Sequence, residues 1–245
     1  MPELAILLAT YNEAENLPRL VAVLEGLGLD LHLLVVDDNS PDGTQQVGQR
    51  LATIYGNLTI IGRPGKLGLG SALRDGLRAA LTTDAPYIMT MDADYSHDPR
   101  DVPRLLEAMR HGGADLVQGS RYVEGGSVQG WSPRRWLLSR LANLLYQWGA
   151  GGPHESTNNF RIYSRRAASV VLARARGCGY EFVPEATLLV LAAGLRVREV
   201  PITFTGRNHG CSKLGKRQAA TAIVSVASTS LQFRLRLGRF ARHAA

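Results

Sequence analysis

The chain has 245 residues, of which 45% are hydrophobic, 20% charged and 7% aromatic, and this balance excludes an intrinsically disordered protein. Its two cysteines cannot form a disulfide framework, and their spacing does not match a structural zinc site. The formal charge of +7 is concentrated at one end, because residues 200–245 hold eight basic and no acidic side chains. Charge confined to a tail, without a recognition motif, excludes a nucleic-acid-binding domain.

The first half alternates short apolar runs with longer amphipathic stretches. This alternation predicts βαβ units, and therefore an α/β fold whose parallel sheet has helices on both faces. Ser40 followed by Pro41 predicts a helix N-cap with proline at the first helical position. The expected strands are Leu4–Ala9, Leu31–Asp37, Leu58–Ile61, Tyr87–Asp92 and Asp115–Val117, and the expected helices are Asn16–Leu27, Pro41–Ile54, Gly70–Leu81 and Asp98–Met109.

The second half is less regular. We expect helices over Trp131–Trp148 and Val183–Ala193, a strand over Val197–Phe204, a polar loop over 205–213 and a long final helix. The least polar late segment, residues 219–231, is shorter than the roughly 20 residues of a membrane span, so no transmembrane span is expected. The opening residues resemble no secretory signal, so we expect a cytoplasmic protein.

Two carboxylates, Asp92 and Asp94, stand at the end of one expected strand. Side chains two positions apart on a strand point to the same face, and converging like charges are stabilised by a cation. Carboxylate oxygens suit a hard divalent ion such as Mg²⁺ or Mn²⁺, which would also bind substrate phosphates. A polar turn at the end of the strand is the alternative interpretation.

A second acidic pair, Asp37 and Asp38, ends another expected strand. Neighbouring residues face opposite ways, so one aspartate can reach a ligand while the other supports the loop. A carboxylate at such a strand end can accept hydrogen bonds from the ribose or base of a nucleotide, and a helix-capping turn is the alternative. Two strands of one parallel sheet that both end in acidic residues favour a combined nucleotide and metal site.

Other chemistries lack support in the sequence. Residues 65–70 have the glycine spacing of neither an ATPase phosphate loop nor a dinucleotide fold, so we expect these glycines only to let the chain turn tightly. No Ser/His/Asp set or cysteine nucleophile is convincing. His97, beside the acidic site, is interpreted as a loop residue that shapes the turn before Asp98 and Pro99.

Basic residues mark two further regions. Arg207 and Lys213 lie in a glycine-containing loop that suits a phosphate which must enter and leave, although a solvated loop has the same pattern. The helix expected over Trp131–Trp148 combines a leucine stripe with arginines, and the final helix combines arginines with apolar side chains. Both helices are candidates for a membrane interface, with core packing as the alternative for the first.

The order and spacing of these segments resemble the dolichol-phosphate mannose synthase group of family 2 glycosyltransferases, which have the GT-A fold. The resemblance runs through nearly the whole chain. It rests on Thr10–Glu13, Val36–Thr44, Lys66–Gly70, Met91–His97, Gly119–Tyr122, Ser139–Arg140 with Ala142–Asn143, Phe160–Arg161, Gly179–Tyr180, Glu199–Ile202 and Gly210–Leu214.

The resemblance implies a Rossmann-like, mostly parallel sheet flanked by helices. The implied catalytic domain covers residues 1–214, with a nucleotide and metal half over 1–122 and an acceptor half over 123–214, and a basic amphipathic helix follows over 215–245. Such enzymes transfer mannose from GDP-mannose to a polyprenyl monophosphate with inversion, as peripheral proteins on the cytoplasmic face of a membrane. Whether a small membrane subunit is a further partner stays open.

The resemblance also assigns roles to individual residues. Asp92, Asp94 and Ser96 would hold Mg²⁺ or Mn²⁺, and the catalytic residues would be Asp94, Arg121, Arg207 and Lys213. These four would also belong to the nucleotide-sugar site. Of them, Arg121, Arg207 and Lys213 would bind phosphates of the donor or the acceptor. The remaining nucleotide-sugar-binding residues would be Ala9, Tyr11, Glu13, Val36, Asp38, Asp92 and Ala93.

Several positions depart from the family pattern. Ala9 replaces a proline, Ser96 is a weaker metal ligand than the usual residue, and Gly206 replaces an acid. Residues 155–161 and 183–185 also differ, and they fall in the acceptor and sugar half. The alternatives are therefore the same fold with another nucleotide sugar such as UDP-glucose, another acceptor, or a catalytically silent partner subunit that binds nucleotide sugar.

Overall fold

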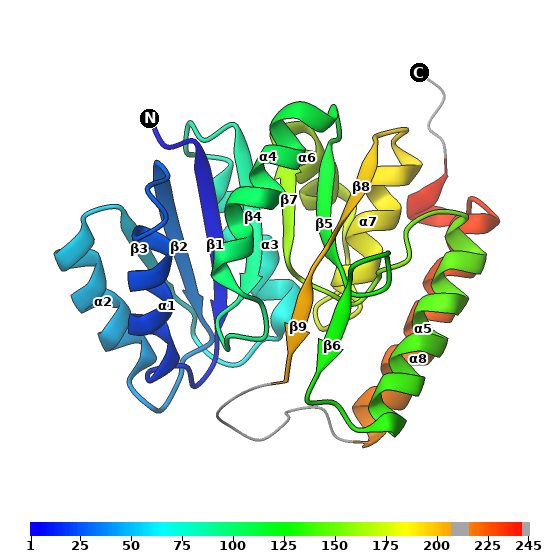
Figure 1. The fold of residues 1–245 in the computed structure, drawn as a ribbon, viewed down its shortest axis with the longest axis horizontal. Helices are drawn as coiled ribbons and strands as arrows, with labels where there is room; N and C mark the ends of the chain where they lie inside the picture. The colour runs from blue at the N-terminus through cyan, green and yellow to red at the C-terminus, as the bar shows by residue number, and fades with distance from the viewer. Residues whose placement is uncertain (207–215, 242–245) are drawn as a thin grey trace.

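A seven-stranded sheet forms the centre of the computed structural model, which describes residues 1–206 and 216–241 (Figure 1). The strand order is β3-β2-β1-β4-β7-β5-β8, and β7 alone runs antiparallel to its neighbours β4 and β5. The mostly parallel α/β sheet predicted from the sequence is thereby confirmed. Its strands are β1 (Leu4–Thr10), β2 (Leu31–Asp37), β3 (Leu58–Gly62), β4 (Tyr87–Asp92), β5 (Leu116–Ser120), β7 (Arg161–Ser164) and β8 (Val197–Pro201).

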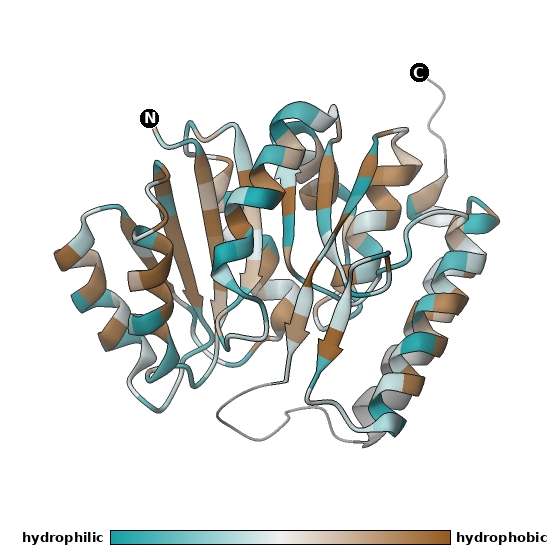
Figure 2. Cartoon of the chain, in the orientation of Figure 1, coloured by the Kyte–Doolittle hydropathy of each residue, from teal (hydrophilic) through white to brown (hydrophobic). Residues whose placement is uncertain are grey.

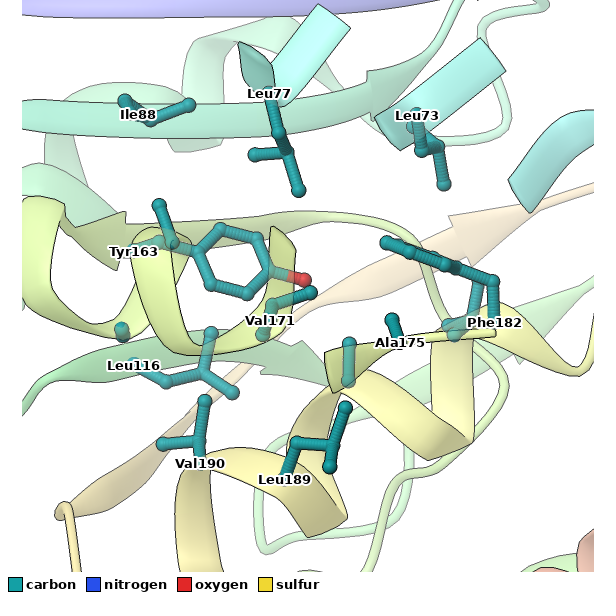
Figure 3. Packing of buried hydrophobic residues seen from close by; sticks show 14 of the residues in the cluster. Leu73, Leu77, Ile88, Leu116, Tyr163, Val171, Ala175, Phe182, Leu189 and Val190 are labelled. Carbon is teal, nitrogen blue, oxygen red and sulfur yellow. The ribbon is translucent and has the colours of Figure 1, made fainter. Parts of the chain in front are cut away.

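Helices cover both faces of this sheet, and each face has its own apolar core. Because both faces are covered, strands such as β1 and β2 are hydrophobic along almost their whole length (Figure 2). In one core, side chains of α3, α6 and α7 pack over β4, β5 and β7 (Figure 3). One face carries α1 (Asn16–Glu25), α2 (Thr44–Tyr55) and α4 (Val102–Gly112), and the other carries α3 (Leu69–Ala80), α6 (Arg165–Arg174) and α7 (Phe182–Ala192).

Two long helices, α5 (Pro133–Ala150) and α8 (Lys216–Arg234), lie side by side beyond the β8 end of the sheet (Figure 1). Two short strands, β6 (Ser127–Gln129) and β9 (Thr203–Thr205), pair in parallel. In the chain, β6 precedes α5 and β9 precedes α8. Two 3₁₀ turns complete the fold, η1 (Pro99–Asp101) and η2 (Gly238–Phe240). No helix in the described parts of the chain is both long enough and apolar enough to cross a bilayer.

The expected helix start at Pro41 is wrong. Helix α2 begins at Thr44, after Gly43 in the left-handed region (φ +87°). Ser40 instead donates from its hydroxyl to Asp37 Oδ1 (2.5 Å) and accepts from the backbone N–H of Asn12 (2.9 Å). Its side chain therefore ties the loop after β1 to the loop after β2, which leaves it unable to cap a helix.

Three further elements differ from the sequence expectations. The strand expected over Val197–Phe204 is two strands, because Ile202 leaves the main sheet between β8 and β9 and its carbonyl accepts from Ser127 N (3.0 Å). Strand β7 and helix α6 were not expected, and neither was the short strand β6. The first residue of β7 is a completely buried arginine, Arg161, which a hydrophobic pattern cannot indicate.

Candidate active site

The carboxyl ends of β1, β2 and β4 meet at one edge of the sheet. In the strand register, Ala9 of β1 lies between Val36 of β2 and Asp92 of β4. Loops that follow parallel strands open at this edge, where ligands of open α/β sheets bind. The structure therefore brings together three of the residues that the resemblance assigned to the nucleotide.

The two aspartates that end β2 have different partners, as the alternation of the strand predicts. Asp37 is completely buried and accepts from Thr10 Oγ1 (2.9 Å) and from the backbone N–H of Ser40 (2.9 Å). Asp38 is 5% exposed; Oδ1 pairs with Arg63, and Oδ2 accepts from the backbone N–H of Gly68 (3.1 Å). Asp37 supports the loops, while Asp38 joins β2 to the glycine-rich segment before α3.

That glycine-rich segment has a structural reason for its composition. Gly68 has φ +97°, and a Cβ there would lie 2.6 Å from the carbonyl oxygen of Cys178. The expectation of a tight turn is confirmed at Gly68. Just before them, Lys66 Nζ lies 3.9 Å from the centroid of the Tyr11 ring, which places a cation and an aromatic ring at the carboxyl end of β1.

Glu13, another residue assigned to the nucleotide, lies in the loop after β1 and is 8% exposed. Its backbone N–H donates to Thr44 Oγ1 (2.9 Å), and its carboxylate accepts from Asn16 Nδ2 (2.8 Å). These bonds fix the loop after β1 against the first turns of α1 and α2.

Asp92, Asp94 and Ser96 follow one another at the end of β4. Asp92 Oδ1 accepts from Asn159 Nδ2 (3.2 Å), and Asp94 Oδ1 accepts from the backbone N–H of Ser96 (3.0 Å) and from its hydroxyl. Ala93 between them is buried. These groups are oxygen donors, which fit Mg²⁺ or Mn²⁺, and substrate phosphates would complete the coordination sphere. Within residues 1–206 and 216–241, no cluster of three or more His, Cys, Asp or Glu side chains is arranged to hold a metal by itself.

His97 lies in the loop between β4 and η1, as expected, and its side chain is buried. Its ring stacks on Phe160 (centroids 4.9 Å apart), and Phe204 approaches it edge-on (5.3 Å). Burial lowers the pKa of His97, although the carboxylates of Asp92 and Asp94 oppose this shift. His97 Nδ1 lies 4.0 Å from Asp92 Oδ2. The imidazole ring is therefore part of the aromatic packing next to the carboxylate that ends β4.

Arg121 follows β5 and is only 6% exposed. Its Nε and Nη2 donate to the two carboxylate oxygens of Glu155 (2.7 and 2.6 Å), and Nη2 also donates to Thr157 Oγ1 (2.7 Å). Trp131 and Phe204 face the guanidinium, each with its ring centroid 5.1 Å away. Burial alone would raise the pKa of Glu155, but the charge and hydrogen bonds of Arg121 bring it below its usual value, so the pair is ionised.

Sequence reasoning named Arg121 but missed the role of Glu155, and it missed Arg63, the partner of Asp38. Arg63 directly follows β3, so a cation at a third strand end was the available signal. The remaining assigned residues, Arg207 and Lys213, lie outside the described residues.

The comparisons with known proteins agree with this arrangement. The model of the family described as "Glycosyl transferase family 2" matches residues 5–172, which is more than half of the chain. The chain belongs to glycosyl transferase family 2. It is 39% identical over 233 residues to a polyprenol monophosphomannose synthase of Mycolicibacterium smegmatis, covering 94% of this chain and 88% of that protein. It is 36% identical over 230 residues to an undecaprenyl-phosphate mannosyltransferase of Micrococcus luteus, covering 93% and 94%.

Solved structures share the fold at low sequence identity. Mannosyl-3-phosphoglycerate synthase from Rubrobacter xylanophilus superposes with a TM-score of 0.71 at 18% identity, covering 96% of this chain and 76% of that one. Glucosyl-3-phosphoglycerate synthase from Mycobacterium tuberculosis, in complex with Mg²⁺ and uridine diphosphate, gives 0.68 at 18% identity, covering 94% and 79%. The mannosyltransferase PcManGT from Pyrobaculum calidifontis, in complex with GDP-Man and Mn²⁺, gives 0.58 at 15% identity, covering 96% and 73%. This family 2 enzyme is thus a glycosyltransferase with the predicted GT-A fold.

Proposed function

We propose that this glycosyltransferase transfers mannose from GDP-mannose to a polyprenyl monophosphate, with inversion at the anomeric carbon, to give polyprenyl-phosphate mannose. The observation that carries the proposal is the likeness over almost the whole chain to two proteins named for mannosyl transfer to polyprenyl phosphates. The described residues are consistent with it, because acidic groups and a buried arginine lie at the candidate site and α5 exposes large apolar side chains.

In this proposal the nucleotide binds across the carboxyl ends of β1, β2 and β4, against Ala9, Tyr11, Glu13, Val36, Asp38, Asp92 and Ala93. Asp94, with Asp92 and Ser96, would hold Mg²⁺ or Mn²⁺, and the bound ion would neutralise charge on the departing diphosphate. Arg121, Arg207 and Lys213 would bind phosphates of donor or acceptor. The buried ion pair with Glu155 keeps the guanidinium of Arg121 in one orientation, which suits it to positioning a phosphate.

The reaction needs no strong general base. A lipid phosphate is already anionic near pH 7, so its oxygen can attack the anomeric carbon directly as the bond to the diphosphate breaks. The ring of His97 packs against Phe160 and Phe204 with both nitrogens buried, so it is not placed to serve as such a base.

We also propose that the α5–α8 pair rests on the cytoplasmic face of a membrane, where the acceptor's prenyl tail remains. Large apolar side chains of α5 are exposed to solvent, and arginines stand beside them. Such a surface suits a membrane interface better than water. The exposed apolar side chains of α5 are Trp136, Leu137, Leu138, Leu141, Leu144, Leu145 and Trp148. The division into a nucleotide and metal half (1–122), an acceptor half (123–214) and a membrane-contacting segment (215–245) is part of the same proposal.

The test is product formation from GDP-mannose and a short polyprenyl phosphate, with Mg²⁺ or Mn²⁺ and then with a chelator. A mannosyl lipid that forms only with metal supports donor, acceptor and cofactor together. UDP-glucose serves as the competing donor, and a preference for it would overturn the assignment of the sugar. Metal-dependent binding of GDP without any product would retain the nucleotide site and move the search to other sugars and acceptors.

A further inference from the structure

A cavity of about 680 Å³ lies where the carboxyl ends of α5 and α7 meet the end of α8 and the turn that follows it. Figure 1 shows these helix ends at the opposite edge of the molecule from the carboxyl ends of β1, β2 and β4. The cavity has the size of a small-molecule site. It is separate from the candidate active site, and none of the proposed catalytic steps uses it.

Three arginines line this cavity, Arg174 of α6, Arg234 of α8 and Arg236 just beyond α8. Among the described residues, neither Arg174 nor Arg236 has an ion pair or a side-chain hydrogen bond, and none of the residues that line the cavity is acidic. The nearby carboxylate of Glu185 is already paired with Arg239 (2.6 Å). Within the described residues, no acidic side chain therefore pairs with Arg174 or Arg236, and these two cations favour an anionic ligand.

Aromatic side chains also line the cavity. Phe233 and Phe240 pack edge to face (5.7 Å between centroids), and Trp148 is 65% exposed with Arg234 over its ring (4.7 Å). Two exposed leucines, Leu235 and Leu237, follow α8 in the same turn. A ligand that fills this cavity would thus have an anionic group for the arginines and apolar parts for the aromatic wall.

We propose that this arginine cavity, defined by Arg174, Arg234, Arg236, Trp148, Phe233 and Phe240, binds the phosphate group of an anionic phospholipid. The acyl chains would lie along Trp148 and the exposed leucines, continuous with the apolar surface of α5. The lipid bound here is not the acceptor, because the proposed transfer occurs at the other edge of the molecule. The site adds a chemical preference, for anionic over neutral phospholipid, to the proposed membrane contact.

A soluble short-chain phosphatidylglycerol tests the cavity without a bilayer, by calorimetric titration of the full chain. The test variant is Arg174→Gln/Arg236→Gln. The matched control, Arg50→Gln/Arg166→Gln, removes the same charge from exposed positions on α2 and in the first turn of α6, outside the cavity. Because the test variant loses two charge-assisted contacts to the phosphate, it should bind roughly 30-fold more weakly, and the control should bind like the parent.

Three results would overturn the proposal. An equal loss in the control would show unspecific attraction. Inorganic phosphate binding as tightly as the short-chain phosphatidylglycerol would show a site for a free anion, and equal binding of short-chain phosphatidylcholine would show a site without charge preference. Circular dichroism and thermal unfolding verify that each variant is folded.

Vesicles and the transfer assay separate this inference from the proposed enzyme function. The parent and the control should sediment with vesicles of phosphatidylcholine mixed with phosphatidylglycerol, and the test variant should remain largely in solution. Transfer of mannose to a detergent-solubilised polyprenyl phosphate should be equal in all three proteins. If transfer is absent from all of them while lipid binding follows the expected order, the enzyme assignment fails and the lipid site stands.

Discussion

Arg121 and Glu155 form a two-bond ion pair inside the protein, with side chains only 4% and 0% exposed. The arginine follows β5, and the glutamate precedes β7, so the pair joins two neighbouring strands at the edge where the candidate site lies. A buried pair of this kind fixes a geometry, but each partner becomes costly when the other is removed.

Glu155→Gln should therefore lower the free energy of unfolding at pH 7 by about 3–5 kcal/mol, because it leaves the guanidinium of Arg121 buried without a counter-charge. Urea unfolding measures this change. Glu124→Gln, at an exposed glutamate, is the control and should change little. An equal loss of unfolding free energy in both variants would mean that the buried ion pair contributes no more to stability than an exposed glutamate does.

The same pair predicts a pH dependence. The pKa of Glu155 in the folded protein lies below its ordinary value of 4.5, so its contribution is complete above 4.5 and is lost as the pH falls through the lower, folded value. The stability difference between the parent and Glu155→Gln should accordingly shrink as the pH falls below 4.5. Urea unfolding across this acid range checks the sign, and a difference that grows towards low pH would contradict it.

Gly68→Ala should destabilise the protein by about 1–3 kcal/mol and weaken the binding of GDP. Alanine is strained at φ +97°, and its Cβ would lie 2.6 Å from the carbonyl oxygen of Cys178. A shift of this segment would also move the N–H of Gly68 away from Asp38. Gly65→Ala is a matched control, since nothing lies within 4 Å of its Cβ position. Thermal unfolding and GDP titration measure both effects, and similar results for the two alanines would refute the explanation.

Asp94→Asn should reduce kcat for mannosyl transfer by about 10²–10³-fold, since it removes one charge from the proposed metal site. Asp84→Asn, at an exposed aspartate that precedes β4 and so lies at the opposite end of that strand from Asp92, should have the activity of the parent. The assay is run at increasing Mn²⁺ concentration. Full activity of Asp94→Asn under limiting metal would exclude Asp94 as a metal ligand.

Leu137→Gln should weaken binding to vesicles roughly tenfold without changing the thermal unfolding midpoint, because this side chain of α5 is 52% exposed and packs little in the folded protein. Ile54→Gln, at a 70% exposed position of α2, is the control and should bind vesicles like the parent. Equal binding by both variants would place the membrane contact elsewhere than α5.

Much of the sheet could be predicted from sequence, because β1, β2 and β4 are short apolar runs separated by amphipathic segments. Strand β7 could not, since it has four residues and begins with the buried Arg161. The donors of Arg161 bind backbone carbonyl groups of Ser156, Asn158 and Val183, which the tertiary structure brings to it. A rule based on hydrophobic periodicity assigns such an arginine to the surface.

The site shows the same limit. The adjacency of Ala9, Val36 and Asp92 follows from parallel pairing, so the sequence was enough to predict a shared edge. The partners of Asp38 and Arg121 could not be predicted, because Arg63 and Glu155 reach them only through the packing of separate loops. Spacing along the chain indicates which residue types lie at a strand end, but it does not indicate what their side chains will pair with.

The antiparallel direction of β7 brings the beginning of that strand, instead of its end, to the site edge. The residues just before it therefore reach both sides: Glu155 contacts Arg121, and Asn159 contacts Asp92. One contiguous stretch of about six residues thus contacts both Asp92 and the buried Arg121. Exchanging this stretch for that of a relative should therefore change both contacts in a single step while the sheet stays intact.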